Sequence, residues 1–375
     1  MKFIHLSDLH LGKRVNEFLQ LEDQHYILIN ILKIIDEQKA DCVIIAGDVY
    51  DKSVPTAEAV SLFDWFLTSL CERKVKVLII SGNHDSAERL SFGNRIMTYS
   101  GVFISPIFDG RVKTVEICDN YGKINFHLLP FLKPANVRKY FPDIEINSYN
   151  DALKAVVESM NINKSERNVL VTHQFVTGAV RCESEEISVG GSDNVDYNIF
   201  DDFDYVALGH IHSPQSVGRE TVRYCGTPLK YSFSEVNHKK SVTVVTMAEK
   251  GDIKIETVPL IPKRDMVKIK GDYNTLVSKN FYSSLNTDDY FHITLTDEED
   301  IIDAVAKLRV IYPNIMNLCF DNRRTRENKE ISADEYIEQK TPFELFAEFY
   351  ELQNNQPLSE KEAEFLEKII EKEEF

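Results

Sequence analysis

Short runs of apolar and β-branched residues recur along the chain, and each one ends at a polar loop. The run over 75–81 is typical, and the tetrapeptide Gly82-Asn83-His84-Asp85 follows it directly. Runs of this kind predict strands that are buried in a parallel sheet. The same pattern recurs over 2–7, 42–46, 169–172 and 205–208.

Segments with helical spacing separate these runs. We expect amphipathic helices over 19–39, 55–73 and 149–160 and a short helix over 86–100, with Pro55 in the first turn of the second one. Antiparallel strands are expected over 102–131, and further strands over 222–225 and 241–246. The alternation of strands and helices predicts an α/β fold with added hairpins.

Groups able to bind a metal or move a proton stand where each of the five runs ends. Half of the ten histidines lie at these points. In open α/β sheets, chemistry gathers at the carboxyl ends of the strands. The residues concerned are Asp8, His10, Asp48, Asn83, His84, His173, His210 and His212.

The spacing of these residues indicates more than one metal ion. Asp8 and His10 lie two residues apart, as do His210 and His212, so each pair can point the same way on an extended backbone. Counted without His84, the set offers seven ligands, which is too many for one ion and suits two ions that share a carboxylate. Asp48 is the natural bridge. Imidazole and carboxylate together suit Mn, Fe or Zn, and paired ions promote displacement at phosphorus.

Each motif has a simpler interpretation when it is taken alone. Asp-x-His arises by chance, a single histidine after a strand such as His173 is often a core residue, and Gly-Asp-x-x-Asp is often a turn. Gly-Asn-His-Asp is much more specific, and Gly-His-x-His is intermediate. Five such motifs in this order, each at the end of a strand, favour one joint metal site.

The ordered motifs resemble the signature of the calcineurin-like metallophosphoesterases. Within that superfamily the chain resembles the SbcD nucleases, because of the segments 7–13 and 224–235. The resemblance implies a two-sheet α/β/β/α sandwich over 1–260. It also implies a small α+β DNA-capping domain over 261–326 and a linker with helical docking elements over 327–375.

The resemblance also implies a role for each site residue. One ion would take Asp8, His10, Asp48 and His212, and the other would take Asp48, Asn83, His173 and His210. The ions are expected to be Mn²⁺. His84 would protonate the leaving oxygen, and Asp51 would orient His84 by accepting its other ring proton. A helix-capping role is the alternative for Asp51.

By the same resemblance, the activity would be that of a Mn²⁺-dependent DNA phosphodiesterase. It would act as a 3′-to-5′ exonuclease on duplex ends and as an endonuclease on single strands and hairpins. A coiled-coil ATPase of the SbcC type would gate it within a complex that serves DNA repair, recombination and replication. The chain would form a homodimer within a heterotetramer.

Two other functions stay open at this point. One is a different phosphoesterase, such as a cyclic-nucleotide phosphodiesterase or a protein phosphatase. Lys52 and Asp85 stand where phosphoprotein phosphatases usually carry Arg and Glu, which disfavours that branch. The other is a non-catalytic scaffold with the same fold, which the intact set of expected ligands disfavours.

Charge and composition limit the partners and the compartment. A net charge of −17 is unusual for a DNA-binding protein, but residues 327–375 carry 15 acidic and 5 basic side chains, so much of the excess lies outside the predicted site. No apolar stretch reaches the ~20 residues of a membrane span. The first strand already carries a ligand, which argues against a signal peptide, and the six cysteines are scattered. We therefore expect a cytoplasmic protein with reduced thiols.

The last third of the chain has its own pattern. Strands over 266–270, 290–295 and 316–320 and a helix over 300–311 predict the small α+β unit, for which a packing or dimerisation module is the alternative. Two helices beginning near Thr341 and Ser359 carry capping boxes and apolar faces. They predict a docking element for the partner, and a tail that folds back on its own body is the alternative.

Overall fold

The computed structural model describes residues 1–182, 185, 194–299 and 301–323, and single residues between 343 and 366. The chain divides into two compact units. The first comprises 1–269, 277–293 and 304–318, and the second comprises 270–276, 294–303 and the described residues from 319 onward.

Two six-stranded sheets form the framework of the first unit. The first sheet has the order β14-β13-β1-β4-β5-β6, with bounds Ile253–Pro259, Ser241–Met247, Lys2–Leu6, Cys42–Ala46, Lys76–Ile80 and Val102–Ile104. The second has the order β11-β12-β10-β9-β8-β7, with bounds Gln215–Val217, Arg219–Tyr224, Tyr205–Gly209, Arg167–His173, Gly122–Leu129 and Lys113–Asp119. Strands β1, β4, β5 and β6 are parallel, and so are β8, β9, β10 and β12.

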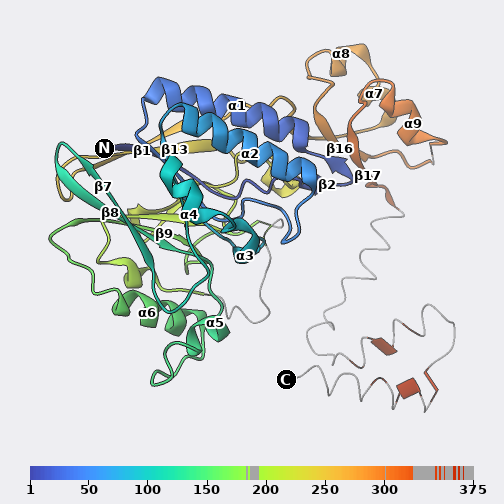
Figure 1. Cartoon of the computed structure of the whole chain (residues 1–375). Coiled ribbons are helices and arrows are strands. Elements are labelled where there is room, and N and C mark those ends of the chain that lie inside the picture. Colours follow the sequence, from blue (N-terminus) through green and yellow to red (C-terminus); the bar gives the residue numbers. More distant parts are fainter. Residues whose placement is uncertain are drawn as a thin grey trace. The chain divides into compact units, whose positions relative to one another are not determined.

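Helices cover the outer face of each sheet (Figure 1). Helices α1 (Leu21–Gln38) and α2 (Ala57–Glu72) share a core with the first sheet, and α5 (Pro134–Arg138) and α6 (Tyr149–Ser159) share a core with the second. A third core lies between the two sheets. The predicted α/β/β/α sandwich is therefore confirmed.

The central strands are mostly apolar because both of their faces are covered. Along β1, Phe3 joins the core between the sheets, whereas Ile4 joins the core under α1 and α2. Neither side chain is exposed to solvent. This arrangement explains why the sequence shows continuous apolar runs instead of the alternation of a half-exposed strand.

Some expected elements differ in detail. The single helix over 86–100 is three short pieces, α3 (Ala87–Leu90), α4 (Asn94–Met97) and η1 (Thr98–Ser100), because Gly93 adopts a φ of 72° between the first two. Strand β6 pairs in parallel with β5, so the antiparallel prediction over 102–131 holds only for the β7–β8 hairpin. Helix α2 is capped by Thr56, so Pro55 precedes the helix.

A three-stranded sheet has the order β15-β16-β17, with bounds Met266–Gly271, Tyr290–Leu295 and Ile315–Phe320. Helix α9 (Ala304–Arg309) is shorter than the predicted helix over 300–311. The remaining short elements are β2 (Arg14–Val15), β3 (Phe18–Leu19), η3 (Tyr197–Phe200), η4 (Phe233–Glu235), α7 (Tyr273–Leu276) and α8 (Lys279–Tyr282).

Two expectations on the C-terminal part stay predictions. The helices near Thr341 and Ser359 fall largely outside the described residues, and the domain boundaries at 260 and 326 are likewise untested.

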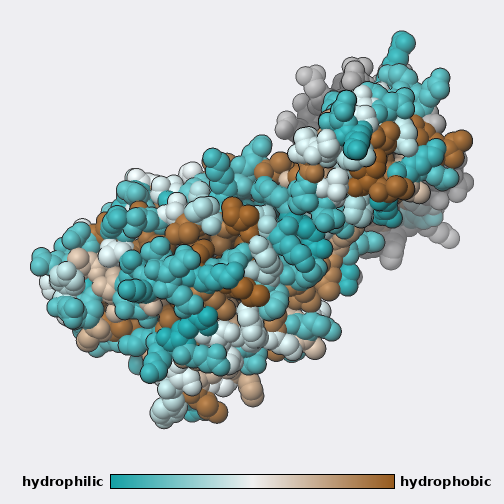
Figure 2. Space-filling model, turned by 90° about the horizontal axis from the view of Figure 1, so that it is seen from above, coloured by the Kyte–Doolittle hydropathy of each residue, from teal (hydrophilic) through white to brown (hydrophobic). Residues whose placement is uncertain are grey.

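The face of the molecule seen in Figure 2 is mostly hydrophilic, with apolar residues in small groups. Among the described residues, no helix combines the length and the apolar character that crossing a membrane requires.

Candidate metal centre

The candidate site lies where parallel strands from both sheets end. Asp8 follows β1, Asp48 follows β4, and His210 follows β10. The loops of the two sheets are joined here, because the backbone N–H of His210 donates to both Asp8 carboxylate oxygens at 3.1 and 3.2 Å. The ring Nδ1 of His173 lies 2.8 Å from the carbonyl oxygen of Ala46. The site thus lies between loops of the two sheets.

The structure brings the predicted ligands together. Donor atoms lie within 4.8 Å of one another in the sets Asp8, His10 and His212, Asp8, Asp48 and His173, and His10, Asp48 and His84. The Asn83 Oδ1 atom lies 2.9 Å from His173 Nε2 and 3.1 Å from His210 Nδ1. All seven candidate ligands and His84 therefore belong to one connected cluster.

The loops that carry these residues hold an unfavourable backbone conformation. Four non-glycine residues of the cluster have positive φ, namely Asp8 (53°), His10 (44°), Asp48 (49°) and His210 (102°). Such conformations cost about 1–3 kcal/mol each and concentrate at functional sites. The chain therefore tolerates strain to aim these side chains at one point.

Glycines make the close approach of the loops feasible. A Cβ atom on Gly47 would overlap the ring of His173, and one on Gly82 would overlap the Asp48 carboxylate. A Cβ on Gly209 would meet the Ala46 carbonyl oxygen. The glycines that precede the polar residues in three of the motifs are thus required by space.

The His10 side chain supplies the test of whether a metal fits here. Its imidazole is 1% exposed, and neither ring nitrogen has a hydrogen-bond partner among the described residues. The nearest carboxylate oxygens lie 3.6 Å away on Asp51 and 3.7 Å away on Asp48. An unsatisfied buried polar atom costs about 1–3 kcal/mol. A divalent cation between His10 and Asp48 would satisfy both residues, so the donor set fits such an ion.

The electrostatics of the cluster are dominated by burial and by the two aspartates. Burial raises the pKa of Asp8 to about 6 and lowers the pKa of His210 to about 3. Burial alone would also lower the pKa of His173, but the charge and hydrogen bond of Asp48 outweigh it and raise that pKa to about 9. When no metal is bound, the aspartate charges thus favour protons on nearby imidazoles such as His173. Metal binding would displace them, since metal ligands must be deprotonated.

A main-chain carbonyl also contacts the ring of His84. Its Nδ1 lies 3.0 Å from the backbone carbonyl oxygen of Asp51, which can only accept, so Nδ1 carries the proton. Its Nε2 lies 3.9 Å from Asp48 Oδ2. The structure thus shows a contact from the His84 ring to the main-chain carbonyl of Asp51, whereas the resemblance implied a contact to the Asp51 carboxylate. That carboxylate pairs with Lys13 at 2.7 Å.

Asp85 ties the loop after β5 to the loop after β4. Its carboxylate accepts from the backbone N–H groups of Gly82, Val49 and Tyr50 at 3.0–3.1 Å. Burial and the nearby Asp48 charge raise its pKa to about 6. Asp85 therefore fixes the position of Asn83 and His84 without facing the centre of the cluster itself.

Sequence reasoning missed a buried network behind His212. Glu235 is fully buried and lies 3.4 Å from His212 Nδ1, and the buried ammonium of Lys240 lies 2.5 Å from Glu235. Lys240 also donates to the His212 carbonyl oxygen at 2.9 Å, and Glu185 accepts from the His212 N–H at 2.6 Å. The network holds His212 through its Nδ1 atom and its main chain. Glu235 ends the segment 224–235, but no sequence signal marks Lys240.

Comparison with known proteins agrees with this geometry. Residues 1–214 match the family described as calcineurin-like phosphoesterase, and residues 262–354 match the family described as type 5 capsule protein repressor C-terminal domain. The D component of the SbcCD nuclease of Staphylococcus epidermidis is 33% identical over 377 residues, which covers 99% of this chain and 98% of that protein. The chain therefore belongs to the calcineurin-like phosphoesterase family and, within it, to the SbcD group. It is a metal-dependent phosphodiester hydrolase.

Solved structures align less closely. A dimetal phosphatase from Danio rerio is 12% identical with a TM-score of 0.41, covering 69% of this chain and 96% of that one. A protein from Thermus thermophilus is also 12% identical, with a TM-score of 0.36 and coverage of 68% and 98%. The family assignment rests on the sequence matches.

Proposed function

We propose that this protein is a Mn²⁺-dependent DNA nuclease, with 3′-to-5′ exonuclease activity on duplex ends and endonuclease activity on single strands and hairpins. The observation that carries the proposal is the cluster of seven candidate ligands that includes the unsatisfied His10, in a chain related along its whole length to a nuclease subunit. Its biological setting would be DNA repair, recombination and replication.

Two divalent ions would occupy the cluster. Asp8, His10, Asp48 and His212 would hold one, and Asp48, Asn83, His173 and His210 the other. When bound, the ions would supply Lewis-acid activation of water and of the phosphate. Mn²⁺ is favoured over Mg²⁺ because four of the seven ligands are imidazoles, which are softer than the oxygen ligands that Mg²⁺ prefers.

His84 would act as the general acid. With Nδ1–H directed at the Asp51 carbonyl oxygen, the second ring proton of the imidazolium sits on Nε2, at the edge of the cluster. From there it can pass to the departing oxygen of the phosphodiester. The exposed fraction of the His84 side chain is 23%, against 1% for His10, so His84 is accessible to a substrate whereas His10 is enclosed.

One assay series tests the proposed activity. The purified protein, loaded with Mn²⁺ or Mg²⁺, is offered labelled duplex DNA, a DNA hairpin, a cyclic nucleotide and a phosphopeptide. We expect cleavage of both DNA substrates in Mn²⁺ and much slower cleavage in Mg²⁺. Faster hydrolysis of the cyclic nucleotide or the phosphopeptide would contradict a nuclease, and equal rates in the two metals would contradict the metal preference.

Self-association is supported by an exposed apolar group. Phe92, Ile96 and Tyr99, in and beside α4, are 82%, 76% and 94% exposed. Side chains of this kind, gathered within eight residues, are typical of a protein interface. We propose that they contribute to a homodimer. Sedimentation velocity should report a dimer for the wild-type protein and a monomer for Ile96→Asp.

The C-terminal segment would bind the partner, a coiled-coil ATPase of the SbcC type that gates the nuclease. All candidate site residues lie before residue 213, whereas residues 327–375 are strongly acidic and so form a poor surface for DNA. Deletion of 335–375 should therefore abolish capture of the ATPase and leave hydrolysis of a small phosphodiester intact. Retention of the partner at full affinity would overturn this role.

A further inference from the structure

A groove of about 390 Å³ opens directly beside the metal centre. Gly82 and Asn83 form its inner end, and the chain that follows β8 forms much of its wall, through Phe131, Lys133 and Tyr140 among others. A molecule in this groove would therefore touch the loop that carries Asn83 and His84.

Phe131 gives the groove an aromatic lining that is tied to the loop after β5. The backbone N–H of Phe131 donates to the Ser81 carbonyl oxygen at 2.9 Å, which ties this wall to the loop after β5. The Phe131 ring meets His173 edge to face, with ring centroids 6.2 Å apart. Ile107 adds an apolar side chain that is 49% exposed. The wall thus presents an apolar surface within reach of the ligands.

The lining of the groove also carries positive charge. Lys133 and Lys139 are exposed, and Lys139 Nζ lies 5.1 Å above the Tyr140 ring. Two carboxylates also line the groove, but Asp85 accepts three backbone N–H groups and Glu88 accepts from the Ser86 hydroxyl at 2.9 Å. The lysines are therefore the charges best placed to meet a bound anion.

We propose that this groove binds an unpaired nucleotide of the DNA strand next to the scissile phosphate. The base lies against Phe131, and the neighbouring phosphates contact Lys133 and Lys139. An aromatic surface beside a positive groove is how proteins bind single strands without reading their sequence. The inference rests on the proposed nuclease function and specifies that the site acts on a locally unpaired strand.

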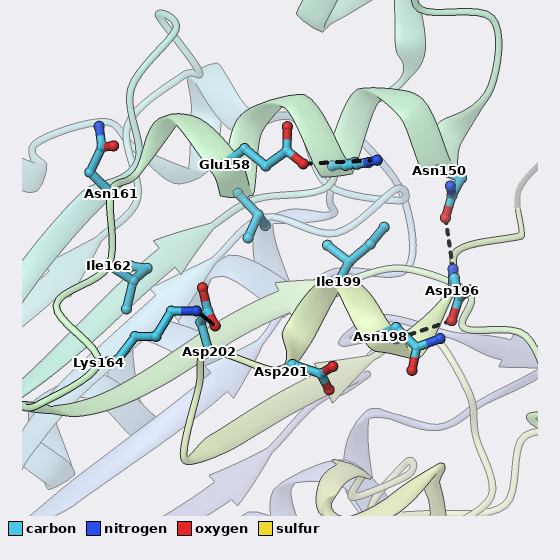
Figure 3. Close-up of a pocket in the computed structure, with 12 residues that line it drawn as sticks. Asn150, Glu158, Asn161, Ile162, Lys164, Asp196, Asn198, Ile199, Asp201 and Asp202 are labelled. Carbon is cyan, nitrogen blue, oxygen red and sulfur yellow. Dashed lines mark hydrogen bonds and ion pairs between the residues drawn. The ribbon is translucent and has the colours of Figure 1, made fainter.

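A second groove provides a contrast within the same unit. It lies between α6 and η3 and is larger, at about 710 Å³, and Figure 3 shows Glu158, Asp201 and Asp202 around it. Its lysines are already paired, since Lys164 lies 2.6 Å from Asp202 and Lys154 lies 3.9 Å from Glu158. Because acidic groups line it and its lysines are paired, we expect this groove to bind phosphates poorly. Its lysines therefore serve as matched controls.

The experiment uses the full-length protein with Mn²⁺, a single-stranded oligonucleotide and bis(p-nitrophenyl) phosphate. Phe131→Leu keeps the bulk beside His173 but removes the stacking face. We expect its KM for the oligonucleotide to rise about tenfold relative to its KM for the small ester. Affinity for the oligonucleotide falls as the salt concentration rises. Lys133→Ala and Lys139→Ala should each make the slope of log affinity against log salt less steep by about 0.7. The control Lys154→Ala should change neither quantity.

Two outcomes would separate the failures. If the wild-type protein cleaves DNA but Phe131→Leu and both lysine variants keep its KM and salt slope, the groove does not bind the strand. If the wild-type protein hydrolyses the small ester but cleaves no DNA, the nuclease function itself is wrong, and the groove assignment falls with it. Thermal unfolding and metal content are measured for each variant. They show whether a raised KM results from loss of folding or of metal.

Discussion

His5 and His10 lie five residues apart, one inside β1 and one in the loop after it, and both imidazoles are buried. Both ring nitrogens of His5 have partners, since Nδ1 lies 3.0 Å from the Tyr205 hydroxyl and Nε2 lies 3.1 Å from the Leu208 carbonyl oxygen. Neither nitrogen of His10 has one among the described residues. A buried histidine that the protein satisfies is part of the core, whereas one that it leaves unsatisfied is directed at something else.

Buried charges divide in the same way. Glu235 and Lys240 neutralise each other at 2.5 Å, and Thr227 and the His212 carbonyl oxygen take further hydrogen bonds of Lys240. Asp48, by contrast, is surrounded by three imidazoles at 3.3–3.9 Å. The first cluster is complete within the protein, and the second is a set of donors around a centre. Burial alone therefore does not mark a candidate metal site; what distinguishes this one is the gathering of imidazoles around Asp48 and the buried ring nitrogens of His10, which have no hydrogen-bond partner among the described residues.

The largest expected effect follows from replacing His10. His10→Leu should lose one ion and reduce phosphodiester hydrolysis to the background of the metal-free protein. The metal-free variant should unfold at the same temperature as the metal-free wild type or higher, because two unsatisfied nitrogens are removed from the interior. Metal analysis and thermal unfolding in a chelator test this. A large loss of stability in the chelator would mean that His10 is a structural residue like His5.

The effect of replacing His84 should be intermediate between the effect of replacing His10 and that of replacing His5. His84→Gln is expected to slow DNA cleavage by about 10²–10⁴-fold, which is the usual contribution of a general acid, with both ions retained. The matched variant Asn83→Ala should lose metal instead. Metal content measured beside the cleavage rate separates them, and loss of an ion from His84→Gln would make His84 a ligand.

Replacing one member of the Glu235–Lys240 pair should affect both stability and metal binding. Lys240→Met leaves the Glu235 carboxylate buried without its cation, so the free energy of unfolding should fall by about 3–5 kcal/mol. Metal affinity should fall by about 10–100-fold, because Lys240 no longer holds the His212 carbonyl oxygen and the Glu235 carboxylate in place. The double variant Glu235→Leu/Lys240→Met should recover stability but not metal affinity. Recovery of both would show that the pair acts only in folding.

His5→Leu should give the smallest effect, and one on stability only. It leaves the Leu208 carbonyl oxygen and the Tyr205 hydroxyl without the imidazole, so at neutral pH the free energy of unfolding should fall by about 1–3 kcal/mol. The metal content and the rate of the folded protein should match the wild type. A change in metal content would place His5 in the metal centre.

The pH dependence of stability gives the same residue a second test. Burial, and then the charge of Arg223, lowers the pKa of His5 to about 3, against 6.5 in the unfolded chain. Between these values the unfolded chain binds the extra proton, so the stability due to neutral His5 is present above pH 6.5 and is lost as the pH falls. The gap in stability between wild type and His5→Leu should therefore narrow toward pH 4. A constant gap would mean that His5 does not titrate in this way.

The sequence by itself determined the framework and most of the candidate site. Buried parallel strands need apolar residues on both faces, so β1, β4, β5, β9 and β10 appear as continuous runs. Polar residues cannot lie within such strands without partners, so the ligand candidates stand out at their ends. Helical spacing predicted less well where a single residue decides the backbone geometry. Gly93 is an example, because it divides the helix expected over 86–100.

Only the tertiary structure decided which contacts complete the site. The main-chain carbonyl of Asp51 meets the His84 ring, and the residue type at position 51 could not indicate this, because chain direction sets where a carbonyl oxygen points. Glu235 and Lys240 reach His212 from another part of the chain, and the groove beside Asn83 is formed by the segment after β8. Such contacts depend on how the two sheets meet. The pattern of residues along the chain does not show how the sheets pack, since it indicates whether each strand is buried but not which distant residues contact it.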